Sequence, residues 1–239
     1  RGIDLSRYFN ILDIRRNILP PQNVIRASIP GSNKSVFVKN ENIESNIEVD
    51  IEIKGESKKD LRQVVNQLAS KLHGNSPGKL IFLDEPDKYY LAILEGDTTL
   101  KEFYVYGTTT LNFLLLDPVK YGKTVQTPIN AGIQTIYNLG TYETNCKMII
   151  NVSRDISDLK ITKVDTGEFI YLNDVYSTYT FKAGDEILID FENHVVKKNG
   201  YIIMKFLSLE SDFFNLSVGA NRIELSTGRG KIEFVERWL

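Results

Sequence analysis

The sequence predicts a mainly β protein of two domains, in which an N-terminal β-sandwich-like domain carries one amphipathic helix and a β-sandwich follows. Three observations support this class. Short runs rich in β-branched and aromatic residues alternate with turn residues along most of the chain. Only residues 58–72 repeat apolar residues at helical spacing. A segment rich in glycine and proline, 118–140, separates the half with the helix from the half without one.

The clearest strand covers residues 47–54, where apolar and charged residues alternate strictly. This alternation is typical of a strand with one face in a core and the other in solvent. In the first half the other predicted strands are 35–39, 79–83, 89–94, 102–106 and 109–116. In the second half they are 147–152, 159–164, 168–172, 179–181, 186–191, 194–197, 201–206, 215–218, 222–226 and 231–238.

Local signals place the helix and the tightest turns. Ser57 is a suitable N-cap for the helix, and Gly74 can end it. Asn199-Gly200 lies between two apolar runs and predicts a type I′ hairpin turn. Residues 227–231, Thr-Gly-Arg-Gly-Lys, resemble a phosphate-binding loop but lack its spacing and the helix that should follow, so we predict a hairpin turn there.

The domain boundary is placed in the glycine- and proline-rich segment. We expect a first domain at residues 1–127 and a second at 128–239. The helix belongs to the first domain, whereas the second contains only short strands joined by tight turns.

Composition excludes several function classes. The chain has 239 residues and a net charge of −2, so it lacks the basic surplus that binds nucleic acid or anionic membranes without specificity. No apolar stretch approaches the roughly 20 residues of a membrane helix. Cys146 is the single cysteine, and His73 and His194 are the only histidines. None of them has further ligands at metal-binding spacing, so we predict neither a metal nor a cofactor.

The sequence gives only weak support for any other catalytic or metal-binding residues. Asp84-Glu85-Pro86-Asp87 concentrates three carboxylates, as a calcium site or an acid/base pair would, but the pattern of a calcium-binding loop is missing. A solvated turn is the simpler interpretation. No serine lies in a nucleophile elbow, and no catalytic constellation is visible, so we predict that the protein is not an enzyme.

Two sets of residues are candidates for contacts. Glu48, Asp50 and Glu52 form an acidic stripe on one face of the strand at 47–54. Tyr90, Phe213 and Phe214 belong to adjacent aromatic pairs, which on a strand send one ring to each face, and they are interface candidates. The simpler alternatives are a plain solvent face for the stripe and a two-sided core for the aromatic rings.

The ordered set of motifs resembles the distal tail proteins (Dit) of siphophages over essentially the whole chain. The resemblance is carried by Gly2-Ile3-Asp4-Leu5-Ser6, Ile29-Pro30-Gly31, the acidic strand followed by the helix, the stretch from Leu80 to Tyr90, and Leu114-Leu115-Leu116-Asp117-Pro118. The second half adds Asn138-Leu139-Gly140-Thr141, the stretch from Gly184 to Asp190, and Ser211-Asp212-Phe213-Phe214.

The resemblance implies an N-terminal ring-forming domain and a C-terminal galectin-like β-sandwich, with the strand at 231–239 a candidate to return to the first domain. It further implies a hexameric ring at the virion tail tip, assembled in the host cytoplasm, that joins the tail tube protein to the tail-associated hub or lysin protein and lets DNA pass. Neither sequence-specific DNA binding nor membrane insertion is expected. Glu48, Asp50 and Glu52 are then candidates to face the lumen, where carboxylates would repel phosphates. The alternative function is a carbohydrate-binding module that adsorbs to host cell-wall glycans, and a hydrolase is the least favoured reading.

Overall fold

The computed structural model describes residues 4–31, 33–174 and 180–239. It divides into two compact units, residues 1–120 with Leu239, and Tyr121–Trp238. The mainly β prediction is confirmed, since the described residues form many strands, one α-helix and one 3₁₀ turn. No helix in this part of the chain has the length and apolar character needed to span a bilayer.

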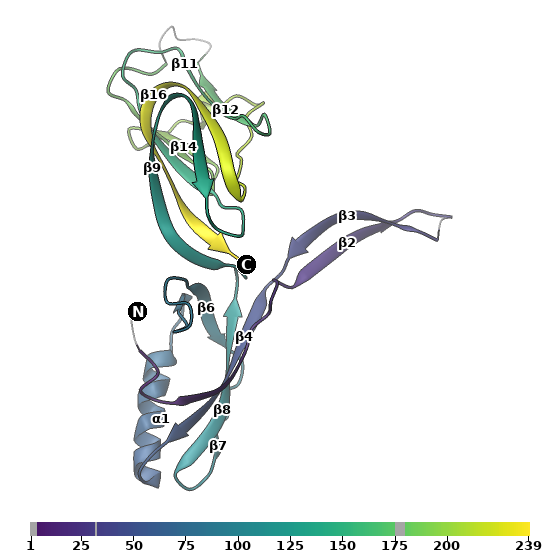
Figure 1. Cartoon of the computed structure of the whole chain (residues 1–239), viewed down its shortest axis with the longest axis vertical. Coiled ribbons are helices and arrows are strands. Elements are labelled where there is room, and N and C mark those ends of the chain that lie inside the picture. The colour runs from purple at the N-terminus through teal and green to yellow at the C-terminus, as the bar shows by residue number, and fades with distance from the viewer. Residues whose placement is uncertain (1–3, 32, 175–179) are drawn as a thin grey trace. The chain divides into compact units, whose positions relative to one another are not determined.

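The first unit is built on a six-stranded antiparallel sheet (Figure 1). Its strand order is β1-β4-β8-β6-β5, and the short β7 pairs with β8. The bounds are β1 (Asn10–Arg15), β4 (Ser45–Lys54), β5 (Gly78–Leu80), β6 (Tyr90–Glu95), β7 (Lys101–Glu102) and β8 (Tyr106–Leu115).

The helix α1 (Lys58–Leu72) covers the apolar face of this sheet, as predicted. The backbone N–H of Asp60 donates to Ser57 Oγ at 3.2 Å, which caps the first turn. Leu61 and Leu68 are the buried helix residues, and they join Val49 and Ile51 of β4 in one core. The opposite, polar face of β4 is therefore left outside this core.

A separate hairpin consists of β2 (Gln22–Ser28) and β3 (Ser35–Asn42). It leaves the sheet after β1 and returns into β4, and Figure 1 shows it as a long two-stranded ribbon. Its base is closed by the backbone N–H of Ile43, which donates to Pro21 O at 2.9 Å. The sequence prediction included β3 but missed both β1 and β2.

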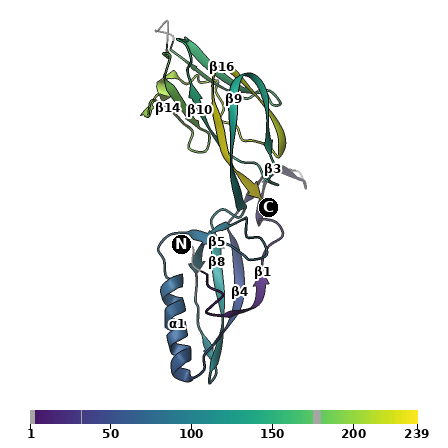
Figure 2. The ribbon, with the colours of Figure 1, turned by 60° about the vertical axis from the view of Figure 1, so that its left-hand side comes forward.

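The second unit is an eight-stranded antiparallel assembly with the order β12-β11-β16-β10-β13-β14-β15, in which β9 also pairs with β16 (Figure 2). The bounds are β9 (Lys120–Asn138), β10 (Cys146–Asn151), β11 (Asp158–Lys163), β12 (Phe169–Asn173), β13 (Glu186–Asp190), β14 (Val195–Lys198), β15 (Tyr201–Ile202) and β16 (Gly219–Trp238). A single core of isoleucine, leucine and phenylalanine side chains fills it, with Phe181, Phe191 and Phe214 the largest. Asn199 and Gly200 both have positive φ, 50° and 84°, as the type I′ prediction requires.

Several local predictions are wrong. The segment expected to be a linker contains the 19-residue strand β9. The expected strand at 102–106 is mostly the turn between β7 and β8, and 215–218 contributes only an isolated bridge at Leu216. The expected strand at 201–206 is the two-residue β15 followed by a 3₁₀ turn, η1 (Met204–Phe206). The predicted strand at 179–181 falls partly outside the described residues.

The Thr227–Lys231 segment is also not a hairpin turn, because it runs inside β16. There β16 passes from β11, which it pairs at Leu225, to β10, which it pairs at Gly230. A Cβ on Gly230 would lie 1.8 Å from the carbonyl oxygen of Ile149, so only glycine fits against the β10 backbone. β16 pairs with strands of the second unit, and that unit runs from Tyr121 to Trp238.

Candidate functional site: a charged sheet face and an exposed hairpin

The polar face of the first sheet carries the acidic stripe. On β4, Ile47, Val49, Ile51 and Ile53 are at most 4% exposed and point into the core. The intervening residues Glu48, Asp50 and Glu52 therefore lie together on the other face. The register places them beside Asn112, Thr110 and Thr108 of β8.

Arg15 from β1 binds this stripe. Its Nε donates to Glu48 Oε2 at 2.8 Å, and its Nη1 and Nη2 donate to the two oxygens of Asp50 at 2.6 and 3.1 Å. Nη1 also reaches Asp13 at 3.1 Å, and Thr110 Oγ1 donates to Asp50 at 2.6 Å. A planar guanidinium suits this bidentate arrangement. The sequence reasoning missed Arg15, because its contact with β4 depends on a strand register that local patterns do not reveal.

The arginine changes the electrostatics of the stripe. Hydrogen bonds from Arg15 and Thr110 hold the pKa of Asp50 below its ordinary value of 3.8. The hydrogen bonds that Arg15 donates to Asp50 and Glu48 raise the pKa of its guanidinium. Glu52 is paired separately with Lys54 at 2.8 Å. The face is therefore a network of fixed ion pairs in which carboxylates still outnumber cations.

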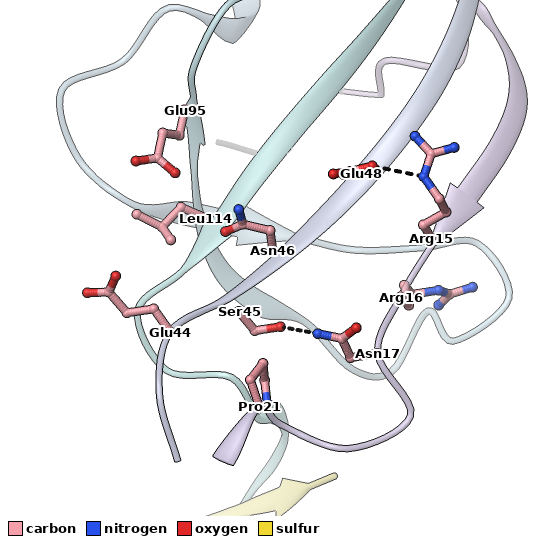
Figure 3. A pocket seen from close by; sticks show the side chains of 10 residues that line it. All are labelled: Arg15, Arg16, Asn17, Pro21, Glu44, Ser45, Asn46, Glu48, Glu95 and Leu114. Carbon is pink, nitrogen blue, oxygen red and sulfur yellow. Dashed lines mark hydrogen bonds and ion pairs between the residues drawn. The ribbon is translucent and has the colours of Figure 1, made fainter. Parts of the chain in front are cut away.

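An open pocket of about 560 Å³ lies at one end of this face, beside the base of the hairpin (Figure 3). Its charged lining residues are Arg15, Arg16, Glu44, Glu48 and Glu95. Asn17 Nδ2 donates to Ser45 Oγ at 3.0 Å and closes one wall. Figure 3 shows Glu44 and Glu95 separated from the Arg15–Glu48 ion pair, and neither makes an ion pair or a side-chain hydrogen bond within the described residues.

The acidic turn at 84–87 is tied to its surroundings by ion pairs. Asp84 binds Arg16 at 2.5 Å, and Glu85 binds Lys120 at 2.9 Å and Lys88 at 3.1 Å. These contacts lower the pKa of both carboxyl groups, with Arg16 the largest cause for Asp84 and Lys120 for Glu85. Across residues 4–31, 33–174 and 180–239, no three His, Cys, Asp or Glu side chains gather in a way that could hold a metal ion. The turn is thus held by ion pairs to Arg16, Lys88 and Lys120, all residues of the first unit.

The aromatic interface candidates all contribute to packing. Tyr90 is 9% exposed and Phe214 1% exposed. Phe213 is half-buried, with its ring stacked on His194 at 4.9 Å. The most exposed tyrosine rings are found elsewhere, at Tyr104 (80%), Tyr137 (60%) and Tyr201 (79%).

Several exposed apolar side chains lie together on the hairpin. Val24, Val36 and Val38 are each about half exposed, and Phe37 is 63% exposed. β3 is exposed along its whole length, so the hairpin has no covered face there. Isolated two-stranded hairpins are marginally stable in water, and this one presents apolar groups that a partner surface could bury.

Comparison with known proteins assigns both units. Residues 3–115 match a family model described as the phage tail protein RIFT-related domain. Residues 139–238 match the C-terminal domain of the siphovirus-type tail component. The distal tail protein of Bacillus phage SPP1 is 29% identical over 168 residues, which is 70% of this chain and 66% of that protein. The chain thus spans slightly under two thirds of that relative.

The solved structure of the SPP1 Dit protein shares the fold. It superposes with a TM-score of 0.84 and 24% identity, covering 100% of this chain and 97% of that one. The two family domains occur in the same order as the two units, with the SPP1-type C-terminal domain on the second. The chain therefore belongs to the distal tail protein family of siphophages, whose matched relatives are structural tail proteins.

Proposed function

We propose that six copies of this chain form a ring at the distal end of the phage tail. The ring joins the tail tube to the tail-tip hub and leaves a passage for DNA. The observation that carries this proposal is the presence of both family domains, in order, along the chain. Membership of the family supports a location in the phage tail. Our proposal adds the six copies in the ring, the tail tube and the tail-tip hub as its neighbours, and the passage for DNA.

A ring requires a heterologous interface, in which one surface of a copy meets a different surface of the next. The β2–β3 hairpin supplies a first surface, since its apolar side chains are exposed on β3 throughout. The strand edges of the first sheet, at β1 and β5, supply backbone groups that can pair with another chain. We therefore assign the ring contacts to the first unit.

Glu48, Asp50 and Glu52 are proposed to face the passage. Four carboxylates, including Asp13, share this region with two cations, Arg15 and Lys54. Ring symmetry would repeat this negative excess around the axis. A lumen of that sign repels phosphates and lets DNA slide without binding.

The test is direct imaging of the purified protein at high concentration, alone and with tube and hub proteins of the same phage. Six-fold rings in negative stain, with light scattering at six times 27.3 kDa, support the proposal. Monomers under every condition refute it. A cryo-electron microscopy map that places Glu48, Asp50 and Glu52 on the outer rim refutes the lumen assignment alone.

A carbohydrate-binding role of the second unit stays a prediction, favoured by the exposed rings of Tyr137 and Tyr201. Fold alone does not decide it. Cell-wall binding that is lost in a Tyr137→Ser, Tyr201→Ser double variant supports this role, and equal binding by both proteins excludes these residues.

A further inference from the structure

We propose that Asn199 is a site of slow chemical modification, at which deamidation releases the β14–β15 turn from its contacts with β13. The inference concerns the second unit and does not depend on the proposed ring. Asn199 is the only asparagine of the chain that a glycine follows. Glycine has no side chain to shield its backbone nitrogen, and asparagine is among the chemically labile residues of proteins.

The reaction needs only water and a base. The backbone nitrogen of Gly200 loses its proton and attacks the side-chain Cγ of Asn199. The new Cγ–N bond closes a succinimide ring, while the Cγ–Nδ2 bond breaks and the amide nitrogen leaves as ammonia. Water then opens the ring at either carbonyl, which leaves an aspartate or an isoaspartate. The neutral amide has become a carboxylate in both products.

The turn is open to the water and hydroxide that the reaction requires. Asn199 and Gly200 are both exposed. A Cβ added to Gly200 would meet no atom of the described residues within 4 Å, so there is also space beside the turn for the succinimide ring. Steric cover therefore does not protect this site, and any protection in the folded protein must come from hydrogen bonds.

Hydrogen bonds to the start of β13 hold the Asn199 side chain at both ends of its amide. Its Oδ1 accepts from the backbone N–H of Glu186 at 2.8 Å, and its Nδ2 donates to Asp185 Oδ1 at 2.7 Å. The backbone N–H of Asn199 also donates to Glu186 O at 2.8 Å. Turning Cγ toward the Gly200 nitrogen requires both side-chain bonds to break, and the bond to the carboxylate is the stronger kind.

Asp185 is itself fixed as an acceptor. It is 9% exposed, and its Oδ2 accepts from the backbone N–H of Lys182 and from Lys198 Nζ, each at 2.8 Å. Burial acts to raise the pKa of Asp185, but its hydrogen bonds outweigh burial and hold the pKa below the ordinary value of 3.8. Asp185 therefore stays ionised at neutral pH and keeps the amide of Asn199 in place.

The product of deamidation does not fit the same contacts. A negatively charged oxygen would replace the Nδ2 donor, 2.7 Å from the carboxylate oxygen of Asp185. Two carboxylates at this separation repel each other, and both would face the single ammonium group of Lys198. The folded turn thus slows the reaction, but once the reaction has occurred the turn no longer closes on β13.

The first experiment measures the deamidation rate at Asn199 by peptide mass spectrometry, in mildly alkaline buffer. The purified full-length chain is incubated folded, and unfolded in urea. We expect the folded rate to be at least about tenfold lower, because two hydrogen bonds must break. Asn75 is an internal reference, since it is exposed, precedes Ser76 and makes no side-chain hydrogen bond within the described residues. Its two rates should agree within about threefold, because no comparable bonds hold it.

A variant tests the part played by Asp185. Asp185→Ala should raise the folded rate at Asn199 at least about threefold, because one of the two restraining bonds is lost. Leu225→Ala is the matched control, since Leu225 is 2% exposed in the core of the same unit and its truncation destabilises that unit without touching Asn199. The two variants are compared at urea concentrations that give them equal stability, so general opening of the unit contributes equally.

A second pair of variants tests the product. Asn199→Asp introduces its charge and should lower the Tm of the second unit by at least about 4 °C. Adding Asp185→Asn should recover at least about half of this loss, because an amide then faces a carboxylate again, with donor and acceptor exchanged.

Each outcome decides one step. Equal rates at Asn199 in folded and unfolded wild-type protein overturn the protection, and this comparison needs no variant to fold. Acceleration by Leu225→Ala as large as that by Asp185→Ala overturns the role of Asp185. An unchanged Tm in Asn199→Asp, or a loss that Asp185→Asn does not reduce, overturns the release of the turn.

Discussion

Replacing Gly230 by alanine tests how β16 is held in the second unit. The new Cβ would lie 1.8 Å from the Ile149 carbonyl oxygen and 2.9 Å from Ile150 Cα, both backbone atoms of β10. To relieve this clash, β16 and β10 must separate by more than about 1 Å. The separation breaks the hydrogen bonds between them at this point, at roughly 1 kcal/mol each, and opens a cavity beside the packed core.

We expect a loss of about 3 kcal/mol in the unfolding free energy of the second unit, or about 10 °C in Tm for a unit of this size. The assay is calorimetry and urea denaturation. Gly167→Ala is the control, because Gly167 has φ 82° but no atom within 4 Å of an added Cβ. It should cost only the left-handed backbone strain of about 1 kcal/mol. Equal effects of the two substitutions would falsify the backbone-clash argument.

Three further predictions concern the first unit. Leu61→Ala should destabilise it by about 2–5 kcal/mol in urea titrations, since this side chain is 1% exposed between α1 and the sheet; an effect under 1 kcal/mol would show that the helix is not docked. Ser57→Ala should cost about 1 kcal/mol through the lost cap, and Ser57→Asp should recover it, as circular dichroism melts can show. Asp50 and Glu85 have folded pKa values below their ordinary 3.8 and 4.5, so the stability they give is complete above those values. This stability is lost as the pH falls through the lowered pKa values of the folded state. The Tm should therefore decrease at pH values below about 4. Asp50→Asn should flatten that acid slope, and an unchanged slope would contradict the role assigned to Arg15.

Predictions from sequence succeeded where the information is local. Helix α1 follows from a leucine stripe and a cap within a few residues, and the Asn199-Gly200 turn follows from two residues that tolerate positive φ. The alternation on β4 correctly separated the buried isoleucines from Glu48, Asp50 and Glu52.

Predictions failed where glycine and proline have a packing role. β9 contains Gly122, Pro128 and Gly132, which suggested a linker. Among the described strands, however, it pairs with β16 alone, and such an edge position tolerates proline. Gly122 is needed because a Cβ there would lie 2.7 Å from the Trp238 Nε1 atom. These requirements come from segments more than 100 residues apart in the chain, so no local pattern contains them.

The candidate site was predicted only in part. The acidic stripe was visible as alternation, but its cation, Arg15, depends on the register of β1 against β4. The pocket combines the end of β1, the base of the hairpin and the end of β6. The pocket forms because the sheet order brings these segments together, and the sequence pattern did not predict that order.

The pairing of β9 with β16 has a mechanical consequence. The second unit is entered through β9 and left through β16, and the two strands are hydrogen-bonded neighbours. Tension applied through the chain would thus enter the unit on two adjacent strands. β16 is 20 residues long and is held by β11 and β10 as well as β9. Force along the axis of β16 would load its hydrogen bonds to all three neighbours together, in shear, whereas force that pulls β9 and β16 apart sideways would break their shared bonds one after another.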